Sequence, residues 1–182
     1  MKSRYPIITA LLMSGVSSST NAISNDGWAN ISDVGAYTLL GSALILPVTR
    51  DDWQGFRQAG YSIVTAEGVA LLGKAVVHEE RPDNSDNNSF PSGHSSLAFA
   101  SATTMYLRYG WQAGMPAYAL ATLTAGTRVA ARKHFVWDVV AGAAIGSASA
   151  WLFTDAFNDK VQLNPWIDTD GKGGGLDLTM RW

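Results

Sequence analysis

Five long apolar segments, separated by short polar breaks, make up most of this chain. They run over Val34–Val48, Phe56–Val77, His94–Tyr109, Gly114–Ala131 and His134–Phe157. Each segment is rich in Ala, Leu and Gly and is too long for an ordinary strand, and the breaks carry residues that end helices. The pattern predicts an all-α fold, a helical bundle of about five core helices that occupies residues 23–157.

The composition changes after Phe157. A Gly- and Asp-rich stretch, Asp168–Gly175, precedes an alternating segment, Leu176–Trp182, which predicts a hinge followed by a short irregular or strand-like C-terminal tail over residues 158–182. Asp168 and Asp170 resemble the start of a calcium loop. The glycine is out of step and Thr179 stands at the twelfth position, so we predict no metal site there.

The first 22 residues have the three parts of a secretory signal. Lys2 and Arg4 precede an apolar run, Ile7–Val16, and a polar stretch follows it. This run is shorter than the ~20 residues that a spanning helix needs. We therefore expect a cleaved signal peptide and a periplasmic working domain in the cell envelope, with a retained anchor or a short amphipathic or disordered tail as alternatives.

Whether the bundle spans a bilayer is open from the sequence. The uncharged runs Val34–Thr49 and Val139–Thr154 are near the lower length limit for spanning. Against this, the second segment carries Arg57, Glu67 and Lys74, and the mean hydropathy is only +0.03. These features favour a soluble or surface-associated bundle.

Length and charge exclude several classes of protein. At 182 residues and 47% hydrophobic content, the chain suits one domain with a sizeable core. A net charge of -2 gives no general attraction to nucleic acid, so no nucleic-acid partner is expected. The chain has no cysteine, which excludes disulfides, thiolate catalysis and cysteine metal ligands.

Candidate chemistry is concentrated in three short clusters. They are Lys74 to Arg81-Pro82, then Pro91-Ser92-Gly93-His94, then Arg128 through His134 to Asp138, with the polar loop Asp83–Ser89 between the first two. Loops of this composition lie at the surface, so we expect this one at the mouth of a pocket.

The third cluster holds a histidine and a carboxylate four residues apart. On a helix His134 and Asp138 share one face, where the carboxylate accepts a hydrogen bond from one imidazole nitrogen and leaves the other as a nucleophile. Taken alone, such a pair is more often a surface contact. Arg128 returns to the same place if the chain turns near residues 132–133.

The other two clusters offer anion ligands. Ser92-Gly93 after a proline predicts a helix start whose free amides and missing Cβ admit an anion, and Ser92 either donates to that anion or simply caps the helix. In that position His94 can protonate a leaving oxygen, or it is simply a capping or exposed histidine. Lys74 and Arg81 flank a turn and face one anion together, whereas His78 is assigned to the surface or to a supporting role.

Taken together, the three clusters resemble the signature motifs of the type 2 phosphatidic acid phosphatase and vanadium haloperoxidase superfamily. The match extends over about 65 residues in the same order, and Thr127 stands where the family usually has Ser. The resemblance implies a cofactor-free, metal-independent phosphatase with a phosphohistidine intermediate, and with vanadate as an inhibitor.

The resemblance also implies a role for each residue. His134 attacks phosphorus, Asp138 orients it, and His94 protonates the leaving alcohol and later activates water. The remaining matched residues hold the phosphate oxygens: Lys74, Arg81, Ser92, Gly93 and Arg128.

The leading hypothesis is a lipid phosphatase that is associated with the membrane. The apolar Phe90, the uncharged helices and the expected export favour a lipid substrate such as phosphatidate, phosphatidylglycerol phosphate, polyprenyl diphosphate or lipid A. Alternatives are a soluble periplasmic nonspecific acid phosphatase, a vanadate-dependent haloperoxidase, for which the chain is short, and a non-catalytic phosphate-binding protein. The sequence selects no oligomeric state.

Overall fold

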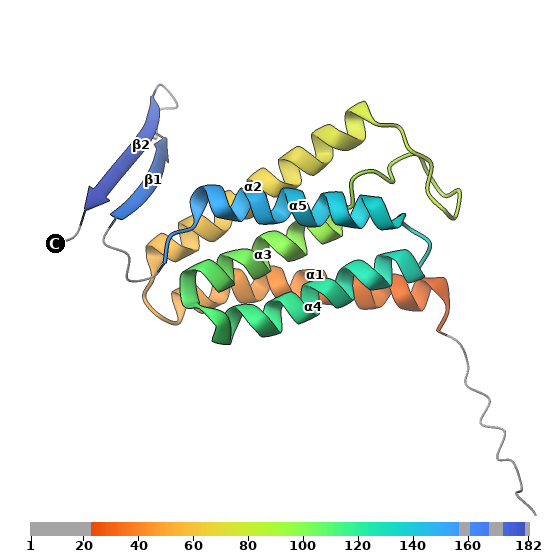
Figure 1. The fold of residues 1–182 in the computed structure, drawn as a ribbon, viewed down its shortest axis with the longest axis horizontal. Coiled ribbons are helices and arrows are strands. Elements are labelled where there is room, and N and C mark those ends of the chain that lie inside the picture. The colour runs from red at the N-terminus through yellow and green to blue at the C-terminus, as the bar shows by residue number, and fades with distance from the viewer. Residues whose placement is uncertain (1–22, 157–160, 168–172, 181–182) are drawn as a thin grey trace, which may run out of the picture.

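The computed structural model describes residues 23–156, 161–167 and 173–180. It contains α1 (Asn25–Val48), α2 (Trp53–Val76), α3 (Gly93–Tyr109), α4 (Trp111–Ala130) and α5 (Val136–Phe153), followed by the antiparallel strands β1 (Val161–Ile167) and β2 (Gly174–Met180), shown in Figure 1. The predicted all-α bundle of about five helices is confirmed.

The structure differs from the sequence prediction at several boundaries. The first helix begins at Asn25 rather than Val34, because the side chain of Ser24 caps it and accepts a hydrogen bond of 3.1 Å from the Gly27 amide. The tail contains two strands where the sequence predicts one, because Asn164 and Pro165, residue types typical of turns, lie inside the first strand. The predicted signal, residues 1–22, and residues 168–172 of the predicted hinge lie outside the described residues.

Consecutive helices run in opposite directions, so their ends gather at two poles of the bundle (Figure 1). One pole combines the starts of α1, α3 and α5 with the ends of α2 and α4. Lys74 lies near the end of α2, Ser92 caps α3, Arg128 lies near the end of α4 and His134 precedes α5. The up-and-down connectivity therefore brings the three clusters together.

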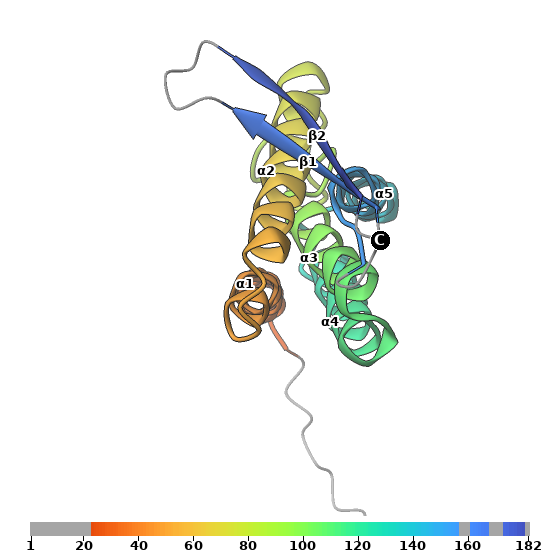
Figure 2. The ribbon, with the colours of Figure 1, turned by 90° about the vertical axis from the view of Figure 1, so that its left-hand side faces the viewer.

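Helix α3 is the centre of the bundle and packs against each of the other four helices. Figure 2 shows it between the pair α2 and α5 and the pair α1 and α4. Most of its buried residues are Ala, Ser or Thr, and a Cβ atom at Gly142 or Gly146 of α5 would collide with the carbonyl oxygens of Ser92 and Ser96. Glycine at these two positions allows α5 to approach the start of α3 closely.

Large apolar side chains lie mainly on the outside of the bundle. Leu72 is 68% exposed, Leu152 is 72% exposed and Trp151 is 69% exposed, whereas the core consists largely of Ala, Ser, Thr and Gly. A water-soluble bundle has the opposite arrangement. Among the described residues, α1 and α5 are long and apolar enough to cross a membrane, judged by length and composition.

A buried ion pair closes the opposite pole of the bundle. Nη2 and Nε of Arg108 lie 2.6 Å and 2.8 Å from the two carboxylate oxygens of Asp52, and both side chains are almost completely buried. Asp52 also caps α2 through the Gly55 amide and accepts a hydrogen bond from the Tyr109 hydroxyl. This cluster joins α3 to the turn between α1 and α2, far from the three chemical clusters.

Candidate active site

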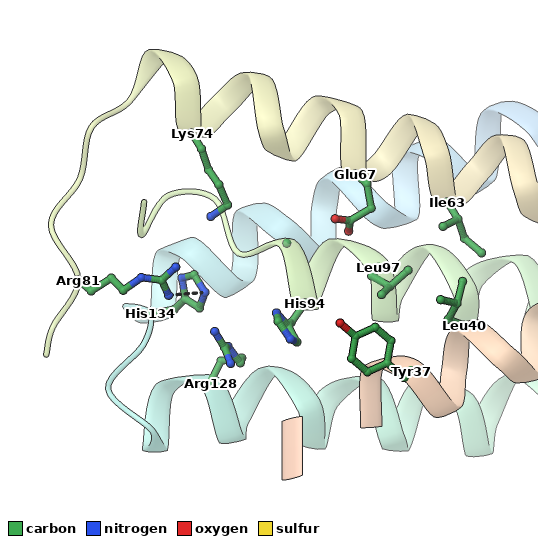
Figure 3. A pocket seen from close by; sticks show the side chains of 11 residues that line it. Tyr37, Leu40, Ile63, Glu67, Lys74, Arg81, His94, Leu97, Arg128 and His134 are labelled. Atoms are coloured by element: carbon green, nitrogen blue, oxygen red, sulfur yellow. Dashed lines mark hydrogen bonds between the residues drawn. The ribbon is translucent and has the colours of Figure 1, made fainter. Parts of the chain in front are cut away.

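A cavity of about 420 Å³ lies at the pole where the clusters meet (Figure 3). Six of the eight site residues predicted from the sequence line it: Lys74, Arg81, Gly93, His94, Arg128 and His134. The other two, Ser92 and Asp138, are fully buried behind this lining. His78, for which the sequence predicts a surface or supporting position, is exposed.

His134 lies in the turn between α4 and α5, not within a helix. Its Nδ1 is 2.7 Å from the backbone carbonyl oxygen of Ser89. Because a carbonyl only accepts hydrogen bonds, Nδ1 carries the proton and Nε2 keeps its lone pair. Nε2 lies 3.4 Å from Nη1 of Arg81, at the cavity wall. Nε2 is therefore the nucleophilic atom that this geometry offers.

Asp138 supports His134 differently from the direct hydrogen bond that the four-residue spacing suggested. Its Oδ2 lies 3.6 Å from Nδ1 of His134 and instead accepts hydrogen bonds from the Ser89 hydroxyl at 2.5 Å and the Phe135 amide at 2.8 Å. The reason is that α5 begins only at Val136, so the two residues do not share a helical face. Asp138 therefore holds both Ser89, whose carbonyl accepts from His134, and Phe135, which follows His134 in the chain.

The surroundings of His134 favour its neutral form. Burial, together with the positive charges of Arg128, Arg81 and Lys74, lowers the pKa of His134 to about 2. The side chain is only 2% exposed. At neutral pH the imidazole therefore has the free lone pair that a nucleophile requires.

Two of the three cations are held by groups of the loop and the turn. Lys74 Nζ donates to the carbonyl oxygens of Asn88 at 2.7 Å and Pro91 at 2.6 Å. Arg81 Nε donates to Asp86 at 2.7 Å, and its Nη1 donates to the carbonyl oxygen of Lys133 at 3.0 Å. These contacts fix both cations beside His134 before any substrate binds.

Arg128 is the third cation, and α1 holds it. Its Nη1 donates to the Ser32 hydroxyl at 3.2 Å and lies 3.6 Å from Oδ1 of Asp33. Figure 3 shows the side chains of Lys74, Arg81 and Arg128 directed toward the space next to His134. Three fixed positive charges around one small space form a binding site for an oxyanion.

The start of α3 completes one wall of this space. The Ser92 hydroxyl accepts a hydrogen bond from the Ser95 amide at 3.4 Å and so caps the helix, while Gly93 lines the cavity. A helix start with free amides and no Cβ at its first position suits an anion. The contact predicted between Ser92 and a phosphate oxygen stays a prediction, because this hydroxyl faces the helix.

His94 pairs with a carboxylate that the sequence analysis did not identify. Oδ1 of Asp33, on α1, lies 2.7 Å from Nε2 of His94. No motif marks Asp33, and the nearest cluster is far away along the chain. The backbone carbonyl of Ser89 was missed for a similar reason, since a carbonyl group carries no residue-type signal.

The inner half of the cavity is mostly apolar. Leu40, Ile63 and Leu97 line it together with the ring of Tyr37, and Glu67 is its acidic member. Figure 3 shows these side chains on the side away from Arg81 and His134. No three His, Asp or Glu side chains in the described ranges are placed to hold a metal ion. The predicted independence from metal stays a prediction.

The fold and the site define a class of protein, a five-helix bundle with an oxyanion pocket and a buried neutral histidine at one pole. Residues 55–162 match the family model of the PAP2 superfamily, and the chain belongs to this superfamily. The family resemblance of the three clusters is thus confirmed. Helix α1, with Asp33 and Tyr37, lies outside the matched residues.

Two characterised relatives are similar in sequence. A lipid A 4'-phosphatase of Helicobacter pylori is 37% identical over 114 residues, which is 60% of this chain and 58% of the relative. A lipid A 1-phosphatase of Porphyromonas gingivalis is 34% identical over 104 residues, which is 53% of this chain and 23% of the relative. The chain thus aligns with little more than half of the first relative and about a quarter of the second.

Two crystal structures have the same fold. LpxE of Aquifex aeolicus superposes with a TM-score of 0.61 at 21% identity, covering 70% of this chain and 83% of LpxE. A transmembrane PAP2-type phosphatidylglycerolphosphate phosphatase of Bacillus subtilis superposes with a TM-score of 0.52 at 24% identity, covering 71% of this chain and 74% of that protein. At these identities the likeness concerns the fold alone.

Proposed function

We propose that this protein is a metal-independent phosphatase that removes a phosphate group from a lipid phosphate such as lipid A, through a phosphohistidine intermediate. The observation that carries the proposal is the buried His134, whose unprotonated Nε2 adjoins a cavity lined by three cations. The two relatives named as lipid A phosphatases support the substrate class.

In the first step, Nε2 of His134 forms a bond to phosphorus while the bond from phosphorus to the leaving alcohol oxygen breaks. His94 donates a proton to that oxygen. Lys74, Arg81 and Arg128 balance the charge on the phosphate oxygens, and the start of α3 adds amide donors. The imidazolium formed at His134 keeps Nδ1 on the Ser89 carbonyl, with Asp138 nearby.

In the second step, a water molecule replaces His134 on phosphorus. The neutral His94 takes a proton from the water, the new oxygen–phosphorus bond forms, and the nitrogen–phosphorus bond breaks. Inorganic phosphate leaves, and both histidines return to their starting protonation states. One histidine thus serves as acid and then as base, while the other carries the phosphoryl group.

We also infer that the bundle lies in a lipid bilayer. Its large apolar side chains face outward around a core of small residues, and α1 and α5 are long enough to span. This arrangement argues against the soluble acid phosphatase, which would expose those side chains to water. The chemical pole then lies at one membrane surface, where a lipid headgroup reaches it.

The test is phosphate release from a substrate panel. The full chain, purified in detergent, is given lipid A, phosphatidate and para-nitrophenyl phosphate, with and without a chelator and vanadate. We expect release from a lipid phosphate that survives the chelator, is inhibited by vanadate and is lost in His134→Ala. No release from any lipid, with turnover of para-nitrophenyl phosphate alone, would support the soluble phosphatase instead.

A further inference from the structure

A second cavity, of about 580 Å³, runs along α1 next to the candidate active site. Residues of α1 supply almost all of its lining, and Met105 of α3 closes one side. Gly41 lies in this lining, and a Cβ atom added there would meet no other atom within 4 Å. We refer to this cavity as the α1 groove.

The α1 groove and the active-site cavity share a wall. Tyr37 lines both of them. Tyr37, Leu40, Ile63 and Leu97 together line the apolar half of the active-site cavity, on the side away from Arg81 and His134. Figure 3 shows the lining side chains in this order, from Arg81 and His134 at one side of the cavity to Leu40 and Ile63 at the other. The lining therefore changes from cationic beside His134 to mostly apolar on the far side, where Glu67 is the acidic exception.

We propose that the α1 groove binds an acyl chain of the lipid substrate while the phosphate group occupies the cationic site. This proposal rests on the proposed lipid phosphatase function. An amphiphile with a phosphate headgroup and a hydrocarbon chain has a charged part for the cationic site and an apolar part for the groove that adjoins it at Tyr37. None of the described residues that line the groove is charged, so it offers nothing to an ionic ligand.

The surface chemistry of the groove favours a hydrocarbon chain over a polar partner. Gly41 opens the groove, and Ile45, Leu46 and Met105 supply apolar contacts. The hydroxyl of Thr49 already donates to the carbonyl of Leu46 at 2.8 Å. Burial of methylene groups is the interaction that such a lining provides. Met105 lies within the family match, and the other residues that line the groove precede it.

A glycine substitution tests the proposal. Gly41→Leu places an isobutyl group in the groove, and Gly60→Leu on α2 is the matched control, since a Cβ atom there also meets nothing within 4 Å. Both variants and the wild type are assayed in one detergent with dioleoyl phosphatidate and with para-nitrophenyl phosphate. Wild-type turnover of neither substrate would refute the proposed function itself, separately from the groove.

We expect Gly41→Leu to lower kcat/KM for the long-chain lipid at least about tenfold, mainly through KM, with turnover of para-nitrophenyl phosphate within about twofold of wild type. Gly60→Leu should leave both values unchanged. An equal loss on both substrates, or a loss on neither, would overturn the proposal.

Photolabelling provides a readout that does not depend on a substituted chain. Wild-type protein is irradiated with phosphatidate that carries a diazirine near the middle of one acyl chain, and labelled peptides are located by mass spectrometry. We expect the label to concentrate on the peptide containing Gly41 and Ile45 and to be displaced by excess unlabelled phosphatidate. Labels spread evenly over all outward-facing helices would mean ordinary contact with bulk lipid and would refute the proposal.

Discussion

Oδ1 of Asp33 lies 2.7 Å from Nε2 of His94, and the two residues come from different helices, α1 and α3. The same oxygen lies 3.6 Å from Nη1 of Arg128. The carboxylate therefore connects the candidate general acid to one of the phosphate-binding cations. Helix α1, which carries no motif residue, takes part in organising the site.

Asp33→Asn tests this connection. The amide keeps the size of the side chain but removes the charge that favours a protonated His94. We therefore expect kcat to fall about tenfold and the basic limb of the pH profile of kcat to move to lower pH. The measurement is a pH profile of kcat. Asp26→Asn, an exposed change in the first turn of the same helix, should leave the profile unchanged. A reduced kcat with an unshifted basic limb would assign Asp33 a merely structural role.

Ser89→Ala tests how His134 is oriented. The change removes the 2.5 Å hydrogen bond from the Ser89 hydroxyl to Asp138, which holds in place the carbonyl that accepts from His134. We expect kcat to fall about tenfold with little change in KM, because orientation of the nucleophile is lost while the cations remain. Ser85→Ala, at an exposed position in the same loop, is the control. Equal kcat values for the two variants would contradict the role of Ser89.

Asp52→Ala tests the buried ion pair at the opposite pole. Arg108 would keep its buried charge after losing the Asp52 carboxylate, and breaking a buried ion pair costs about 3–5 kcal/mol of unfolding free energy. Denaturant unfolding in detergent measures the loss, and Arg57→Ala, an exposed change on α2, should cost less than about 0.5 kcal/mol. Specific activity of the folded fraction should stay unchanged. A cost below about 1 kcal/mol for Asp52→Ala, the upper value for an exposed ion pair, would contradict the burial of the pair.

The titration of His134 predicts a dependence of stability on pH. The pKa of His134 is lowered from 6.5 to about 2 in the folded state. As pH falls below 6.5, the unfolded state binds a proton that the folded state does not, so stability is lost. Above 6.5 both states are neutral at this residue and the effect vanishes.

At pH 5 the loss should reach about 2 kcal/mol relative to pH 7. Comparing the unfolding free energy at these two pH values for wild type and His134→Gln measures it, since the variant lacks the titrating group. His78→Gln, an exposed change, should keep the wild-type dependence. The same pH dependence in His134→Gln would show that another group is responsible.

The sequence was sufficient for the number of helices and for six residues that line the cavity, because apolar runs and closely spaced motifs are local signals. It did not identify Asp33 or the carbonyl of Ser89, which act across contacts between distant segments. Nor did it show that His134 precedes α5, since helix boundaries depend on tertiary contacts. The outward-facing apolar side chains were hidden by the mean hydropathy, which averages them with a polar loop and small core residues.

The central claim is that His134 carries the phosphoryl group, and direct trapping of that group tests it. His94→Ala is mixed rapidly with para-nitrophenyl phosphate, whose good leaving group needs little acid assistance, while the second step lacks its base. The reaction is quenched in alkali, which preserves phosphohistidine, and the digested peptides are analysed by mass spectrometry. We predict phosphate on the imidazole of His134 in the peptide that contains it. No phosphate should be found when His134→Ala is combined with His94→Ala. Phosphate on another side chain, or full turnover in His134→Ala alone, would contradict the account.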